Sequence, residues 1–225
     1  MKKLSVKNLV EFRNKSDKGK KNFAANLKLE KEKINSDGGG DYWVSCLSAI
    51  SNSYKLNDLQ LILEKQEELK EKYKKTEHRR TKIMYKRNID ILSSYENFDL
   101  KKRRPTKKLK FLKKHKDDSV ITIKGLQLQA SPQHVFTFQK GDAEEIGAIW
   151  FIAKLDGFKK DELGMFADIL FRYLKIHFSK NYTVNSKYCI AVDVFSTSDV
   201  NYSQVERKEV PAILDTTLDE IKKLM

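Results

Sequence analysis

The most hydrophobic part of the chain lies between residues 145 and 195, where two apolar runs flank an amphipathic segment. The run 146–153 has almost no polar position, a pattern typical of a strand that is covered on both faces. Residues 159–178 carry apolar side chains at three- and four-residue spacing, which predicts a helix packed on a sheet. The run 188–195 is β-branched and aromatic and predicts a second buried strand. We expect this stretch to form the centre of the core.

Shorter runs on either side extend the β-rich region. Residues 120–128 predict two strands with a break at Gly125. An alternating run then leads through a turn at Gly141 into the first long apolar run, so residues 135–153 should form a hairpin. Near the end of the chain, Pro211 fits the first turn of a helix that would lie over one edge of the sheet.

The first hundred residues have mainly helical patterns. Two short helices are expected before residue 28, and a longer helix should begin at Tyr42 with Asp41 as its cap. Between residues 55 and 95 the helical periodicity slips once, which predicts two helices, either antiparallel or as one long kinked helix, with Thr76 as a candidate cap.

Three consecutive glycines at residues 38–40 invite comparison with a phosphate-binding loop. The stretch lacks the Gly-Lys-Ser/Thr ending that gives such loops a lysine and a metal-binding hydroxyl. We therefore interpret the glycines as a sharp turn before the following helix.

These patterns together predict an α+β protein. The expected organisation is a helical region at 1–100, a basic linker at 101–118, and an α/β sheet domain at 119–225. The last of these should contain a mixed sheet, a crossover helix and a C-terminal helix.

The net charge of +14 is concentrated in the first half of the chain. Residues 1–116 contain 32 Lys and Arg against 15 Asp and Glu, whereas residues 117–225 contain 13 against 16. Such asymmetry points to a polyanionic partner. Residues 101–116 alone hold ten basic residues and no acid, and a phosphate backbone would turn such charge density into affinity through counterion release.

Two groups of basic residues are the candidate phosphate ligands. The first forms a stripe on a predicted helix, and the second belongs to the basic linker. Their members are Arg79, Arg80, Lys82, Lys86 and Arg87 in the stripe, and Lys101, Lys102, Arg103, Arg104, Lys107, Lys108, Lys110, Lys113 and Lys114 in the linker.

Several classes of protein are disfavoured by the sequence. There is no apolar run long enough to span a membrane and no hydrophobic segment after the basic start, so we expect no membrane association and a cytoplasmic location. Cys46 and Cys189 are far apart in apolar surroundings, which favours buried, reduced thiols over a disulfide. The four histidines show no metal-ligand spacing, and no cofactor is evident.

The order of a strand, a hairpin, a crossover helix and a strand ending in Ala191-Val192-Asp193-Val194-Phe195 resembles the restriction-endonuclease-like (PD-(D/E)XK) superfamily over residues 119–195. The resemblance implies an acid near the start of one strand and an acid-x-Lys on the next, which together hold a catalytic metal. This sequence has Gln133-His134 at the first place and Ala148-Ile149-Trp150 at the second. Glu145 and Lys154 cannot substitute, because nine residues of strand separate them by about 30 Å.

Three interpretations follow. The first is a DNA- or RNA-binding protein that grips phosphates through its basic half, in its narrowest form a catalytically degenerate nuclease-like subunit. The second is a Mg²⁺-dependent nuclease of a DNA-defence system that uses Asp142, Glu144 or Asp193. The third is a protein-interaction subunit of a larger complex. Of the three acids, Asp193 lies in a buried strand and must find hydrogen-bonding partners there.

Overall fold

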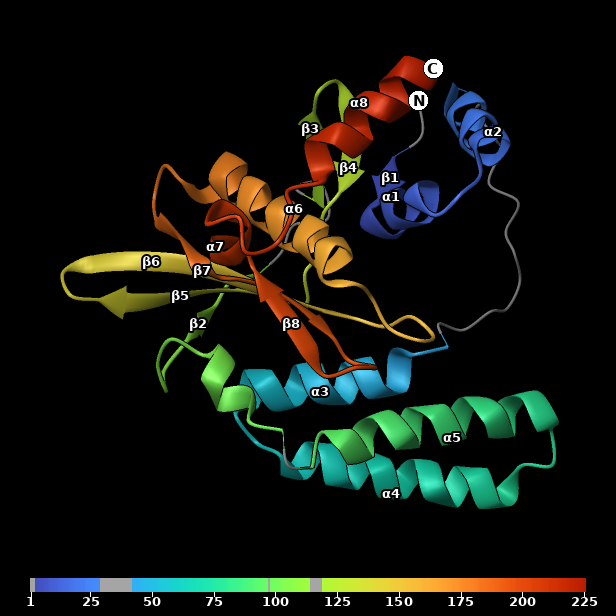
Figure 1. Cartoon of the computed structure of the whole chain (residues 1–225). Coiled ribbons are helices and arrows are strands. Elements are labelled where there is room, and N and C mark those ends of the chain that lie inside the picture. Colours follow the sequence, from blue (N-terminus) through green and yellow to red (C-terminus); the bar gives the residue numbers. More distant parts are fainter. Residues whose placement is uncertain (1–2, 29–41, 97, 114–118) are drawn as a thin grey trace.

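The computed structural model of the chain describes residues 3–28, 42–96, 98–113 and 119–225, and it contains two β-sheets enclosed by helices (Figure 1). The larger sheet has the strand order β2-β5-β6-β7-β8, and the smaller one has the order β1-β4-β3. The chain therefore has the predicted α+β class. The strands of the larger sheet are β2 (Lys110–Phe111), β5 (His134–Lys140), β6 (Ala143–Ile152), β7 (Thr183–Asp193) and β8 (Ser198–Asn201).

The predicted central strand is β6, and both of its faces are covered. It pairs antiparallel with β5 through the expected hairpin and parallel with β7 through the crossover helix α6 (Lys160–Phe178). Trp150 points to the α6 side, where its ring centroid lies 5.2 Å from that of Phe166. Phe151 points to the other side, where its ring centroid lies 5.8 Å from that of Tyr54 in α3 (Val44–Leu56). The unbroken apolar run of β6 is thus explained by its burial on two sides.

Helices form a layer on each face of the larger sheet (Figure 1). The helical layer that contains α3 lies on one face, and α6 lies on the other face together with the smaller sheet and the terminal helices. The helices on the α6 side are α1 (Val6–Arg13), α2 (Asp17–Lys28), α7 (Tyr202–Glu206) and α8 (Leu214–Leu224), and the partners of α3 are α4 (Gln60–Lys75) and α5 (Arg79–Ser94).

Residues 3–28 pack with the C-terminal half of the chain. β1 (Leu4–Ser5) pairs parallel with β4 (Leu126–Gln129), which in turn pairs antiparallel with β3 (Val120–Ile123). Leu4 lies opposite Leu128 and is almost fully buried. The helices of the first hundred residues are therefore divided between the two faces of the larger sheet.

The described part of the basic segment, residues 101–113, is attached to the larger sheet. It begins within a 3-10 helix, η1 (Leu100–Arg103), and later forms β2, which pairs antiparallel with β5. The backbone N–H of Leu112 extends this pairing by donating to the carbonyl of Val135 at 2.9 Å. Residues 110–112 form one edge of the sheet, and residues 101–109 lead to that edge, where the sequence predicted a linker.

Three helix boundaries differ from the sequence predictions. α3 begins at Val44 without a side-chain cap, and the predicted cap Asp41 and glycines 38–40 lie outside the described residues. α5 is capped by His78, whose ring Nδ1 accepts from the N–H of Thr81, whereas Thr76 takes the C-cap position of α4. The last helix begins at Leu214, three residues after Pro211, because residues 211–213 form a non-helical connection.

Both cysteines are buried and neither forms a disulfide. Cys46 packs in the cluster on the α3 side of the larger sheet, and Cys189 packs in the cluster on the α6 side. The prediction of separate, reduced thiols is confirmed. Among the helices of the described ranges, none has the length and apolar character needed to cross a membrane.

Candidate nucleic-acid interface

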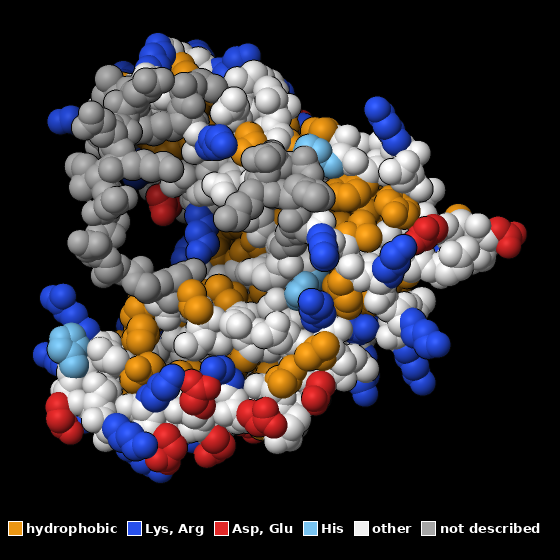
Figure 2. All heavy atoms as spheres, turned by 180° about the vertical axis from the view of Figure 1, so that it is seen from behind, with side chains coloured by type: hydrophobic (Ala, Val, Ile, Leu, Met, Phe, Trp, Pro, Cys, Tyr) orange, Lys and Arg blue, Asp and Glu red, His pale blue; other side chains and the backbone are white. Residues whose placement is uncertain are grey.

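Most lysines of α4 are paired with glutamates of the same helix. Four of them pair with glutamates three or four residues away, and all of these pairs are at least partly exposed to solvent, where an ion pair contributes little stability. Figure 2 shows the result as alternating blue and red side chains along the bottom of the view, where α4 lies. The pairs are Lys65 with Glu68, Lys70 with Glu67, Lys72 with Glu68, and Lys74 with Glu71.

The two arginines of the basic segment have internal roles. Arg103 donates from Nε and Nη2 to the Asp199 carboxylate of β8, at 3.1 and 2.5 Å, and its guanidinium lies 4.2 Å from the centre of the Phe98 ring. Arg104 donates to the carbonyl of Tyr54, and burial lowers the pKa of its guanidinium. These arginines fasten the segment to β8 and α3, so they are not available to a phosphate.

The lysines of the same segment are free for an external ligand. They are exposed, and none of them forms an ion pair with a carboxylate in the part of the chain that the structure describes. Lys114 lies outside the described residues. In Figure 2, blue side chains gather on the right of the view below the tip of the β5-β6 hairpin, and red ones lie at the tip. The exposed lysines are Lys101, Lys102, Lys107, Lys108, Lys110 and Lys113.

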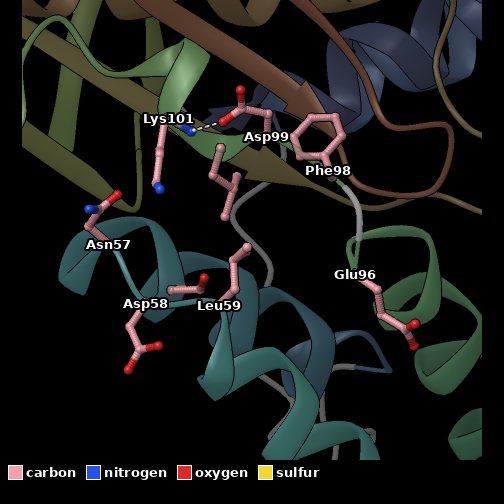
Figure 3. Close-up of a pocket in the computed structure, with 9 residues that line it drawn as sticks. Asn57, Asp58, Leu59, Glu96, Phe98, Asp99 and Lys101 are labelled. Atoms are coloured by element: carbon pink, nitrogen blue, oxygen red, sulfur yellow. Dashed lines mark hydrogen bonds between the residues drawn. The ribbon is translucent and has the colours of Figure 1, made fainter.

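Lys101 is set apart from the others by a cavity of about 320 Å³ between η1 and the corner where α3 meets α4. Figure 3 shows the Lys101 side chain extending towards Asn57, with Phe98 and Asp99 on the η1 side of the cavity and Leu59 on the opposite side. The cavity is lined by apolar as well as acidic residues. We therefore assign Lys101 to this cavity, and Lys107, Lys108, Lys110 and Lys113 to the sheet edge at β2 and the residues that lead to it. Lys102 lies beside Arg103 in η1, near β8.

A bulge in β7 brings further basic residues close to the basic segment, although β5 and β6 lie between β7 and β2 in the sheet. Ile146 of β6 pairs with Val184 of β7, but Ala148, two residues later, pairs with Cys189. The strand β7 thus has extra residues at 185–188, and such bulges commonly redirect side chains near functional sites. Gly147 lies opposite the bulge, where a Cβ atom would come within 2.7 Å of a backbone oxygen.

Asn185 holds the bulge in place. Its side-chain amide donates to the carboxylate of Glu145, and its Oδ1 accepts from the backbone N–H of Lys187 at 3.0 Å. Glu145 also lies 3.4 Å from the Nζ atom of Lys140 at the end of β5. The buried carboxylate of Glu145, which is 9 % exposed, therefore ties together β5, β6 and the bulge.

A pocket of about 350 Å³ lies between the bulge and the basic segment. Lys140 and Lys187 stand at this pocket, and the ring of Tyr188 packs edge-to-face on Phe138 with 5.2 Å between centroids. Burial raises the pKa of Tyr188, which keeps its phenol neutral. The pocket is lined by Pro105 and Thr106 of the basic segment, Phe138, Gln139 and Lys140 of β5, and Asn185, Lys187 and Tyr188 of β7.

Lys140 and Lys187 were missed in the sequence, because they are isolated lysines separated by a strand, a helix and part of a second strand. Only the pairing of β5 and β7 with β6 places them at one pocket. The feature that could have indicated them is the polar run Asn185-Ser186-Lys187 immediately before the buried strand residues, since it interrupts β7 at its bulge.

The stripe on α5 forms a separate basic surface. Arg79, Arg80 and Lys86 are exposed and form no ion pair with a described carboxylate, whereas Lys82 lies 3.6 Å from Glu77 and Arg87 donates to the hydroxyl of Tyr42. The start of α5 lies at the far end of the helical layer from η1 and β2 (Figure 1). The whole helix, sixteen residues or about 24 Å, lies between Arg79 and the end of α5 nearest η1, so the structure does not join the start of the stripe and the basic segment into one site.

Asp193 has a structural role. Its side chain is fully buried and accepts from the N–H of Phe158 at 2.9 Å, the N–H of Phe195 at 3.1 Å and the hydroxyl of Ser196 at 2.6 Å. The approach to the β6-α6 loop is so close that a Cβ atom at Gly157 would lie 2.5 Å from Oδ2. Asp193 therefore joins the ends of β6 and β7.

The three candidate catalytic acids do not meet. Asp142 and Glu144 are exposed at the hairpin, and Glu144 accepts from the Thr137 hydroxyl at 2.8 Å. Asp193 pairs with Ile152 at the opposite end of β6, which puts it more than about 20 Å from Glu144 along the strand. In the described ranges, no group of three His, Cys, Asp or Glu side chains is placed to hold a metal ion.

The positions where the superfamily resemblance would place the metal ligands carry structural side chains. The amide of Gln133 bonds both the N–H and the carbonyl of Phe151, at 2.8 and 2.9 Å. His134 Nε2 lies 2.8 Å from the hydroxyl of Ser51, and Ala148 and Ile149 are fully buried. These contacts hold β5, β6 and α3 together and leave no acid at either position.

Comparisons with protein-family models, with curated proteins and with solved structures find no match to this chain.

Proposed function

We propose that the protein binds nucleic acid by contacting phosphates with lysines along the β2 edge of the larger sheet. The observation that carries the proposal is the contrast between two sets of lysines. Four of the five lysines of α4 have a glutamate partner, whereas Lys107, Lys108, Lys110 and Lys113, and Lys102 in η1, are exposed without a carboxylate partner among the described residues. Unpaired lysines along one edge can neutralise phosphates, and this neutralisation releases the counterions that are condensed on a nucleic acid.

We also propose that the chain has a restriction-endonuclease-like architecture without the metal site. The hairpin of β5 and β6, the crossover helix α6 and the parallel strand β7 support this architecture. The neutral or apolar residues at Gln133, His134, Ala148 and Ile149 support the loss of the metal site. A role in DNA defence and a cytoplasmic location belong to the same proposal, and the location is supported by the two unbridged thiols.

Binding of fluorescein-labelled single-stranded DNA, duplex DNA and RNA at two ionic strengths tests the proposal. We expect binding to all three that weakens steeply with salt, because the contacts are to phosphates. A failure to bind any of them at low salt would end the proposal. Cleavage of any of them in Mg²⁺ would show that the metal site is not lost.

A further inference from the structure

We propose that the pocket beside the β7 bulge receives an unpaired nucleobase, stacked on Tyr188, so that the protein favours single-stranded over duplex nucleic acid. The inference rests on the proposed nucleic-acid binding and adds the class of ligand. It concerns the pocket lined by Lys140, Lys187 and Tyr188, which the phosphate contacts alone do not use.

The first argument is the construction of the bulge. Strand β7 leaves its register at 185–188, Gly147 has no side chain beneath it, and Asn185 fixes its shape through Glu145. These features present Tyr188 at the sheet surface and hold it there. A ring that is fixed before binding loses little conformational entropy when a base stacks on it.

The second argument is the chemistry of the walls. Tyr188 is partly exposed, and Phe138, which is 4 % exposed, supports its ring from below. Pro105 and Thr106 also line the pocket. The side chain of Gln139 donates from Nε2 to the carbonyl of Gly141. Its amide oxygen is the acceptor that remains for the edge of a base. An aromatic face with a few polar groups is the usual composition of a base-binding pocket.

The third argument is the position of the charges. Lys140 and Lys187 flank the pocket, and Lys107 and Lys108 follow Thr106 along the basic segment. A strand whose base entered the pocket would have its phosphates beside these four lysines. The pocket volume of about 350 Å³ falls in the range of small-molecule sites.

The argument for a single strand is geometric. In a duplex each base is stacked and paired, so its face is not available to an aromatic side chain of the protein. An unpaired base offers its face to any aromatic ring, and one such contact is worth about a tenfold change in affinity or more. The pocket therefore favours single strands, and DNA and RNA share the chemistry that it would recognise.

The test compares three fluorescein-labelled ligands by anisotropy: a single-stranded oligonucleotide as DNA and as RNA, the same strand carrying abasic positions, and a duplex. The variants are Tyr188→Ala, Tyr188→Phe, and the double variant Lys107→Ala with Lys108→Ala. We expect Tyr188→Ala to weaken single-strand binding about tenfold and Tyr188→Phe to preserve it. Tyr188→Ala should leave duplex binding unchanged, and the double lysine variant should weaken the binding of every ligand.

The wild-type protein alone also tests the inference, because Tyr188→Ala removes a packed ring and can affect folding. Abasic positions should weaken wild-type binding about as much as Tyr188→Ala does, and should have no further effect in that variant. Equal wild-type affinity for the intact and abasic strands would overturn the base pocket while leaving the phosphate contacts standing. Absence of binding to every ligand would overturn the proposed function as well.

Discussion

Gly147 of β6 lies against the carbonyl group of Tyr188 in the β7 bulge, so that a Cβ atom at position 147 would stand only 2.7 Å from the Tyr188 oxygen. The same Cβ atom would lie 2.8 Å from Cβ of Tyr188 and 3.1 Å from the ring of Phe136. The bulge thus depends on a residue without a side chain in the neighbouring strand. The proposed base pocket and the central strand of the sheet are therefore coupled through one position.

Gly147→Ala should destabilise the protein and displace Tyr188. The added methyl group meets backbone on one side and a buried ring on the other, and overpacking of this kind costs about 1–3 kcal/mol. Urea unfolding measures the loss, and single-strand binding should fall with it. The control is Gly141→Asn in the same hairpin, where a Cβ atom would have no neighbour within 4 Å. Because φ is +59° there, this change strains the backbone without overpacking, and it should leave single-strand binding unchanged. Equal stability of Gly147→Ala and wild type would contradict the close contact.

Replacing Lys107 and Lys108 together by Ala should reduce the salt dependence of nucleic-acid binding. Each phosphate contact contributes about 0.7–0.9 to the slope of log K against log salt, so the slope should become shallower by about 1.4–1.8. The control replaces Lys72 and Lys74 of α4, whose charges are already paired with Glu68 and Glu71. If the two double variants changed the slope equally, the lysines of the β2 edge would have no special role.

Asp193→Asn should lower the free energy of unfolding, because Asp193 has a structural and not a catalytic role. Three donors converge on the Asp193 carboxylate, and the amide group of Asn would place a donor against one of them. A buried mismatch of this kind costs about 2–3 kcal/mol. Asp142→Asn at the exposed turn is the control and should stay within about 0.5 kcal/mol of wild type. Loss of Mg²⁺-dependent cleavage in a normally stable Asp193→Asn protein would instead make this acid catalytic.

Glu162 should make stability depend on pH on the acidic side. Burial raises the pKa of its carboxylate, but hydrogen bonds from Asn14 and the N–H of Lys159, together with the charge of Lys154, outweigh this effect and leave the pKa lowered. At pH values between the folded and unfolded pKa of Glu162, the folded protein therefore binds fewer protons than the unfolded chain. The contribution of Glu162 is complete above its unfolded pKa and disappears as the pH falls through its folded pKa.

The measurement is urea unfolding of wild type and Glu162→Gln between pH 7 and pH 3. At pH 7 the variant should be less stable by about 1–3 kcal/mol, because a buried hydrogen-bonded charge is lost. The difference should shrink as the pH falls. Glu64→Gln on the exposed face of α4 is the control, and a difference for Glu162→Gln that stayed constant with pH would argue against a lowered pKa.

The elements that the sequence predicted well are those whose burial leaves a pattern in the chain. The apolar run of β6 and the three- and four-residue spacing in α6 report local geometry directly. β1 and β2 were not predicted, because each has only two residues and is defined by a partner elsewhere in the chain. Their contacts depend on tertiary pairing, which no local pattern records.

The candidate site was predicted only in outline. Charge density identified the basic segment, but it could not separate its arginines from its lysines. Arg103 differs from Lys102 because Asp199 lies beside it, and Asp199 is distant in the sequence. Lys187 was missed for the converse reason, since it is a single lysine that gains its neighbours only through the register of three strands.

The pairing of β1 with β4 has a consequence for how the protein is made. Leu4 leaves the ribosome 124 residues before its partner Leu128 is synthesised. At 5–20 residues per second, the first strand waits on the order of 6–25 s before the segment that completes it exists. The amino-terminal helices α1 and α2 therefore dock late, after a long loop has closed, whereas the hairpin of α4 and α5 can assemble from neighbours as it emerges.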